Sequence, residues 1–218
     1  LKLERFREEN EESKKIKLLL DLLGSLRDET DREYELVLTK IAQIPGIGKL
    51  FNAVLESKLE EDRGVAYAAF YGLNIYYRHL RDITKVGQLI KKYERWFQNH
   101  PTYPHIKSLY YRSTGSENDC REALKYARMA AEAVPGHAGI LHSLAEIIIN
   151  IAERKVRDCE VDLEEAKSAL ERAIELDPSY PKFYSTKGRL LALQGNFREA
   201  EKLIQKAIDM EDSSAHDY

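Results

Sequence analysis

Apolar side chains recur along the first part of this chain at the spacing of one helical face. Ile16, Leu19, Leu20 and Leu23 lie on one side of a helix predicted over residues 1–26. Acidic and Thr residues at 28–31 offer N-caps for a second helix over 32–43. The Pro-Gly-Ile-Gly segment at 45–48 breaks the pattern, a third helix follows over 51–61, and a fourth starts near Asp62. With 6 Pro and 11 Gly in 218 residues, the chain favours helix throughout.

A second pattern, with a period of 34 residues, governs the rest of the chain. Pro101 and Pro135 are 34 residues apart, and Pro178 follows after 43, which is the same period with nine residues inserted. Two alanine series show the same two intervals: Ala123, Ala166 and Ala200, and Ala130, Ala173 and Ala207. Because three independent series share one insertion, the chain is predicted to contain a helical repeat.

The best-matched units show what the repeated positions do. The second helix of one unit begins Asp162-Leu-Glu-Glu-Ala166 and ends Leu-Asp-Pro178; the next unit carries Gly188, a Gly195-Asn turn and Glu-Ala200. Small residues at 188 and 200 suit two helices that cross closely, and Gly195 suits a positive φ at a helix end. These residues resemble the tetratricopeptide repeat family, most clearly over residues 119–210.

The resemblance implies an all-α fold: a right-handed α-solenoid of antiparallel helix pairs. Repeats are predicted over 70–103, 104–137, 138–180 and 181–211 within a domain of residues 63–218. Tyr111 stands where the family prefers a small residue, and the nine extra residues fall near 155–160. Residues 1–62 are predicted to form an N-terminal helical cap or adaptor, with degenerate repeats as the alternative.

Charge and composition narrow the classes of function. A net charge of -3 with 33% charged residues gives no global attraction to nucleic acid or to anionic membranes. Two cysteines, Cys120 and Cys159, lie far apart in sequence and indicate free thiols in a reducing cytoplasm. No stretch reaches the roughly 20 apolar residues of a membrane span, and no signal peptide is visible. The start at Leu1 is expected to mark a fragment of a larger protein.

No motif supports catalysis or a cofactor, so we predict a protein that is not an enzyme. The segment 44–48 resembles the hairpin of a helix-hairpin-helix element, but the acidic helix after it argues against nucleic acid and favours an ordinary connection. His142 and Glu146 have the i, i+4 spacing of a metal-ligand pair. Such a pair is more often a surface hydrogen bond, so no metal site is predicted.

The family resemblance implies that the first helix of each repeat lines a concave groove and contacts a partner. The repeat register assigns thirteen positions to this groove: Tyr71, Ser108, Glu146, Ser185 and the nine residues named at the end of this paragraph. Together these positions carry five positive charges and one negative charge. We predict that the partner-binding residues among them are Asn74, Arg78, Arg81, His105, Arg112, His142, Asn150, Lys182 and Arg189.

A basic groove favours an anionic ligand: an acidic peptide, a C-terminal carboxylate or a nucleotide phosphate. The leading interpretation is a protein–protein interaction scaffold that binds a protein or peptide segment as part of a larger protein. The alternative is a ligand-sensing or regulatory module that controls an attached effector domain. The Lys and Asn pattern of chaperone-tail binding is kept only near Lys182, which argues against that partner.

Overall fold

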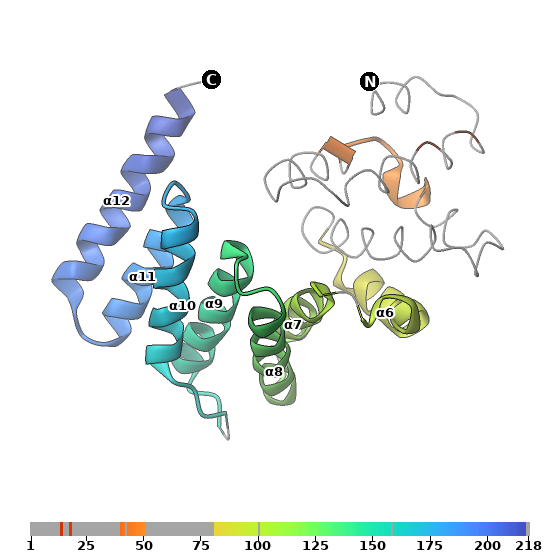
Figure 1. Ribbon diagram of the computed structural model, residues 1–218, viewed down its shortest axis with the longest axis horizontal. Helices are drawn as coiled ribbons and strands as arrows, with labels where there is room; N and C mark the ends of the chain where they lie inside the picture. The colour runs from red at the N-terminus through yellow and green to blue at the C-terminus, as the bar shows by residue number, and fades with distance from the viewer. Residues whose placement is uncertain are drawn as a thin grey trace. The chain divides into compact units, whose positions relative to one another are not determined.

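The structure is a computed structural model that describes residues 14, 18, 40, 41, 43–50, 81–99, 101–157 and 159–216. All regular secondary structure in this part of the chain is helical (Figure 1). The chain divides into two compact units, Leu1–His100 and Pro101–Tyr218. The predicted boundary near residue 62 and most of the predicted N-terminal cap lie outside the described residues, so they stay predictions.

In the first unit, the structure describes a turn, the start of the helix that follows it, and helix α6. The backbone turns at Gly46, whose φ is +76°, and a helix begins at Ile47, so the break predicted at 45–48 is present but short. Ile41, Ile44 and Ile47 around this turn are buried. Helix α6 runs from Ile83 to Phe97, and the Asp82 side chain accepts a hydrogen bond from the Lys85 amide at its start.

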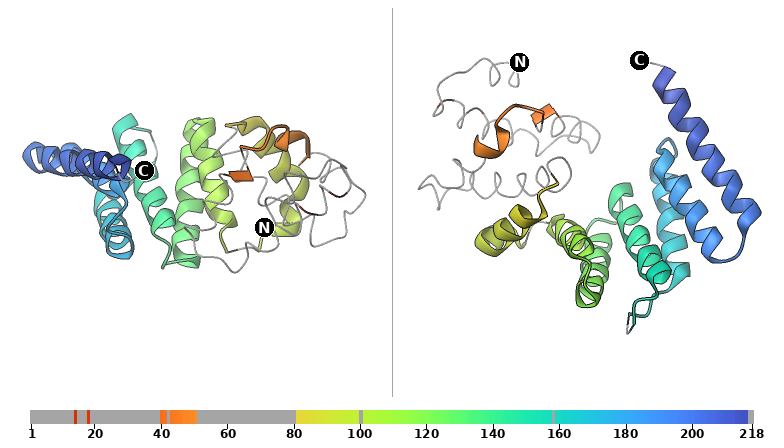
Figure 2. Two further views of the ribbon diagram at one scale, coloured as in Figure 1. Left: turned by 90° about the horizontal axis from the view of Figure 1, so that it is seen from above. Right: turned by 180° about the vertical axis from the view of Figure 1, so that it is seen from behind.

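The second unit consists of helices that pack in consecutive pairs. Pairs form between α7 (Tyr103–Thr114) and α8 (Glu117–Ala133), α9 (Ala138–Arg154) and α10 (Leu163–Leu176), and α11 (Pro181–Leu193) and α12 (Phe197–His216). The second helix of each pair also packs on the first helix of the next, α8 on α9 and α10 on α11 (Figures 1 and 2). This confirms the predicted all-α fold of stacked helix pairs. The right-handed sense of the solenoid stays a prediction.

Local signals in the sequence place the helix ends. Ser116 and Asp162 cap α8 and α10 with their side chains, each accepting a backbone amide hydrogen bond in the first helical turn. Pro181 occupies the first position of α11. A residue at this position makes no intrahelical hydrogen bond through its N–H, so proline, which lacks the N–H, costs nothing there. Gly195, just after α11, has a φ of +82°, as predicted for a helix end that turns back at once.

The repeated alanines are buried where helices cross. Their exposed fractions range from 0 to 4%, for Ala123, Ala130, Ala166, Ala173, Ala200 and Ala207. Gly188 lies against Ala200, and a Cβ added to it would lie 3.0 Å from the Ala200 carbonyl oxygen and 2.7 Å from Cγ1 of Ile204. The prediction that small side chains allow close crossings is therefore confirmed.

The inserted residues lengthen both a helix and a loop. Helix α9 has 17 residues and ends at Arg154, and the next residue, Lys155, adopts a left-handed conformation with φ of 48°. Val156, Cys159 and Val161 in the following loop pack against the core formed by α8 to α11. Cys159 and Cys120 are both free thiols, as predicted. The insertion thus adds apolar contacts without interrupting the stack.

Tyr111 fits where the family prefers a small residue because it stacks on another ring. Its ring centroid lies 5.8 Å from that of Tyr126, with an interplanar angle of 7°. The Lys107 ammonium lies 4.5 Å from the Tyr126 centroid on this aromatic pair. Stacked rings and a cation therefore fill the α7–α8 crossing, where the α11–α12 crossing uses direct contact at Gly188.

Candidate partner-binding face

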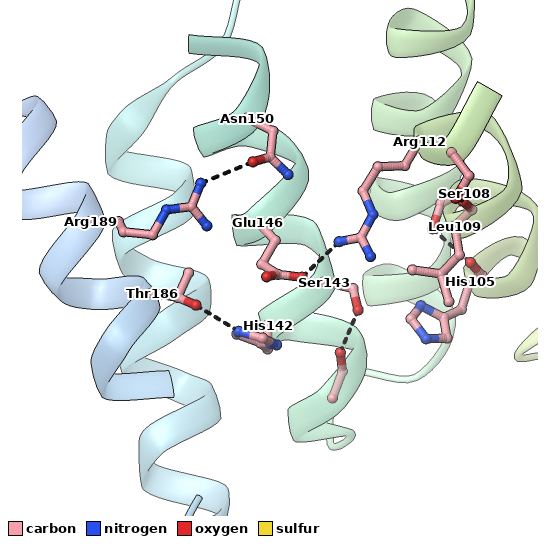
Figure 3. A network of polar contacts seen from close by, with 12 residues as sticks. His105, Ser108, Leu109, Arg112, His142, Ser143, Glu146, Asn150, Thr186 and Arg189 are labelled. Atoms are coloured by element: carbon pink, nitrogen blue, oxygen red, sulfur yellow. Dashed lines mark hydrogen bonds and ion pairs between the residues drawn. The ribbon is translucent and has the colours of Figure 1, made fainter. Parts of the chain in front are cut away.

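Three helices, each the first of its pair, bring their polar side chains together. Helix α9 contacts both α7 and α11, so residues of the two outer helices can reach it from either side. Figure 3 shows side chains of α7 and α11 directed toward α9. We use the term first-helix face for the polar side chains that these helices share, namely Arg112, Glu146, Asn150, Glu153, Lys182 and Arg189.

Arg112 of α7 connects the first pair to α9. Its Nη1 lies 2.7 Å from Oε2 of Glu146, one 34-residue period further along the chain. The two side chains are 29% and 27% exposed, so the ion pair is only partly desolvated. A half-buried ion pair with this geometry is stronger than a fully exposed one. It therefore fixes the guanidinium on the face.

Arg189 of α11 makes the corresponding connection from the other side. Its Nη2 donates to Oδ1 of Asn150 at 2.9 Å and to Oε2 of Glu153 at 2.6 Å, and its Nε donates to Oε1 of Glu153 at 3.3 Å. Glu153 thus accepts two hydrogen bonds from one guanidinium, the geometry that arginine suits best. Together Arg112 and Arg189 form a polar ladder across α7, α9 and α11 (Figure 3).

His142 is buried between α9 and α11. Its Nε2 lies 2.9 Å from Oγ1 of Thr186, and its ring centroid lies 5.0 Å from that of Phe183. Burial lowers the pKa of His142; the Glu146 carboxylate opposes this shift, while Arg112, Lys182 and Arg189 add to it. The imidazole is therefore neutral at neutral pH and acts as a packing and hydrogen-bonding group.

Glu146 lies among these charges. Burial alone acts to raise its pKa, but the neighbouring His142, Arg112 and Arg189 outweigh it, and the pKa is lowered. The carboxylate is therefore ionised at neutral pH and stays paired with Arg112. Stabilisation from this carboxylate is present above its ordinary pKa, about 4.5, and is lost as the pH falls through its lower folded-state value.

The burial of His142 predicts a separate loss of stability in mild acid. Since its folded-state pKa is lowered, the unfolded chain takes up a proton that the folded chain does not, and stability falls as the pH drops below about 6.5. We expect the urea midpoint to fall between about pH 7.5 and 5.5, and His142→Gln to reduce that fall. Equal pH dependence in both proteins would contradict this assignment.

The structure separates the predicted partner-binding residues into distinct groups. Asn74 and Arg78 lie outside the described residues, and Arg81 lies before α6 in the first unit, exposed and with φ of 56°. His105 and His142 are buried, with exposed fractions of 6% and 8%, and the His142 ring packs against Phe183 of α11. The face brings together Arg112, Asn150 and Arg189, with Lys182 exposed at the start of α11.

Glu153 belongs to the face but was missed in the sequence. The register of a standard repeat predicts groove positions only as far as Asn150, whereas α9 continues to Arg154. Glu153 follows Asn150 by one helical turn, so both reach Arg189. With Glu153 included, three described cations (Arg112, Lys182 and Arg189) face two carboxylates, and the face is less basic than predicted.

The described residues were also considered for a metal and for a membrane span. Among them, no three His, Cys, Asp or Glu side chains are grouped so as to hold a metal ion. The Nε2 atom of His142, the candidate ligand beside Glu146, is instead directed at Thr186. None of the described helices is long and apolar enough to cross a membrane.

Comparisons with known proteins found a family match for the C-terminal part of the chain and a similar solved structure. Residues 160–216 match the family model described as tetratricopeptide repeat. One similar solved structure, titled "Crystal structure of MamA protein", aligns with 82% of this chain and 94% of its own, at 16% identity and a TM-score of 0.46. No curated protein sequence matches the chain.

Proposed function

We propose that this chain is a protein–protein interaction scaffold whose first-helix face binds an extended segment of a partner, because residues 160–216 match the tetratricopeptide repeat model. The observation that carries the proposal is the pair of guanidinium groups, Arg112 and Arg189, directed at α9 from opposite sides (Figure 3). Arginine pairs with carboxylates through paired N–H donors, so an acidic partner segment suits this face.

The carboxylates of Glu146 and Glu153, which already pair with Arg112 and Arg189, determine how an acidic partner could bind. Glu146 and Glu153 already accept hydrogen bonds from the two arginines, so a partner carboxylate has to exchange with them. An exchange replaces one ion pair with another, which limits the affinity gained from charge alone. We therefore expect charge to contribute orientation and selectivity, while exposed Lys182 adds attraction for acidic partners.

Binding to matched acidic and basic peptides tests this proposal. Fluorescence anisotropy with an acidic peptide set is expected to show binding that Arg112→Gln combined with Arg189→Gln weakens at least about tenfold, equivalent to about 1.4 kcal/mol. The control is Lys125→Gln combined with Arg172→Gln, which removes the same charge from side chains 59% and 56% exposed on α8 and α10. Equal losses in both variants, or equal binding of basic peptides, would count against the proposal.

The regulatory alternative and the cytoplasmic location stay predictions. A regulatory module requires an effector whose activity follows ligand binding, and the first-helix face alone identifies none. The scaffold interpretation needs only the repeated helix pairs and their shared polar face, so it is the function that the described residues support best.

A further inference from the structure

The two guanidinium groups of the first-helix face are held against one stripe of α9. Glu146 holds Arg112 at 2.7 Å. Glu153 holds Arg189 at 2.6 Å, and Asn150 lies between the two glutamates in the sequence of the helix. Positions 146 and 153 are separated by about two helical turns, so they share one side of α9 and lie about 10 Å apart along its axis. The face therefore offers two positions for a partner carboxylate at that separation.

The Asn150 side chain supplies a hydrogen-bond donor between these two positions. Its Oδ1 accepts a hydrogen bond from Nη2 of Arg189 at 2.9 Å, so its Nδ2 is directed away from the guanidinium (Figure 3). Within the described part of the chain, this Nδ2 donates to no other residue. A donor at this place suits a backbone carbonyl of a segment whose acidic side chains reach both arginines.

The composition of the face favours an extended partner segment over a helical one. A partner helix inserts apolar anchors into an apolar groove. Among the described residues of α7 and α9, no large apolar side chain is exposed, so the face lacks such a groove. An extended segment in the polyproline II conformation has three residues per turn, so side chains three residues apart lie on the same side and about 9 Å apart. This spacing matches the separation of the two carboxylate positions.

We propose that the partner segment is extended and carries two acidic residues with two other residues between them, an inference that rests on the proposed function. One partner carboxylate takes the place of Glu146 at Arg112, and the other takes the place of Glu153 at Arg189. The backbone between them accepts a hydrogen bond from Nδ2 of Asn150. Two acidic residues at another spacing reach only one arginine at a time, so the face selects the spacing of the charges as well as their sign.

Three peptides of identical composition test the spacing. Each contains two glutamates in a background of serine and proline, placed one, three or six residues apart. In fluorescence anisotropy, the peptide with the three-residue spacing is expected to bind about tenfold more tightly than the other two, since it alone engages both arginines. Equal affinity across the set overturns the spacing while an acid-binding scaffold still stands. Binding by none of the three overturns the proposed function as well.

Single charge removals test the one-to-one pairing of arginines and partner carboxylates. In the peptide with the three-residue spacing, each glutamate is changed to glutamine in turn and measured against Arg112→Gln and against Arg189→Gln. Each protein variant is expected to abolish the effect of one glutamate and to keep the effect of the other. If either variant reduced both effects equally, the assignment of two separate positions would be wrong.

A gain of binding tests the exchange of carboxylates. Glu153 is 36% exposed, and Glu153→Gln removes the internal carboxylate that competes for Arg189. This variant is expected to bind the same peptide about threefold more tightly, and to change nothing in a chain that already carries Arg189→Gln. Tighter binding cannot result from a loss of fold, so the outcome is independent of any effect on stability. Unchanged or weaker binding by Glu153→Gln overturns the exchange.

Discussion

A leucine at position 188 is expected to unfold the α11–α12 pair. The added side chain would begin at a Cβ only 2.7 Å from Cγ1 of Ile204 and 3.0 Å from the backbone oxygen of Ala200. The backbone atom cannot rotate away, so α11 and α12 must separate. Overpacking of this kind costs about 1–3 kcal/mol and at times more, and we expect at least about 3 kcal/mol for Gly188→Leu. Replacing a helical glycine returns about 1 kcal/mol of helix propensity, which does not offset that cost.

The measurement is urea unfolding followed by circular dichroism, with a second glycine as the control. Gly136 lies in the turn between α8 and α9, and a Cβ there would have no neighbour within 4 Å. Gly136→Ala is therefore expected to leave the midpoint unchanged or to raise it slightly. If Gly188→Leu melted like the wild type, the two helices could not cross at these residues, and the register assigned to the repeat would be wrong.

Leu170→Ala is expected to produce the second large effect. Leu170 lies in α10 at 0% exposure, within the core shared by α8 to α11. Its loss removes apolar contacts and leaves a cavity between two helix pairs, which costs about 2–5 kcal/mol. Because the side chain packs between pairs, the variant should also weaken the cooperativity of unfolding across the stack.

Leu176 offers the same substitution in the same helix at a position that is 37% exposed. Leu176→Ala is expected to cost less than about 1 kcal/mol, because much of that side chain already contacts water. Comparing the two urea midpoints and slopes separates the loss of burial from the change in helix propensity, which is common to both. Similar costs for both variants would contradict the packing between α10 and α11.

Most of the repeat fold could be predicted from the small residues that recur periodically in the sequence. The alanines at 166 and 200, and those at 173 and 207, repeat at a fixed interval because the two helices of each of these pairs cross at the same place, and Gly188 lies at that crossing in the last pair. A close crossing of this kind has room for little more than a methyl group, so the need for a small side chain shows directly in the amino-acid sequence. Pro181 and Gly195 are visible for a similar reason, since each meets a backbone requirement that few residues satisfy.

The first-helix face could be predicted only in outline. The family register included Arg112 and Arg189, which the structure places beside α9, and Asn150 of α9 itself, but it also included His105 and His142, which are buried. Because histidine is a polar residue type, the sequence favours an exposed position for it, whereas its actual burial depends on which helix packs over it. Helix α11 covers His142 and supplies Thr186 as its hydrogen-bond partner, a pairing across 44 residues.

Sequence alone therefore determined the helical class, the repeat period, the small residues at crossings and the ends of several helices. Each of these depends on backbone geometry or on contacts that recur at a constant interval. The tertiary structure alone decided which charges are paired and which apolar residues remain in contact with water. Glu153 pairs with Arg189, and Ile204 stays exposed although its counterpart Leu170 is buried, because each outcome depends on whether another helix lies alongside.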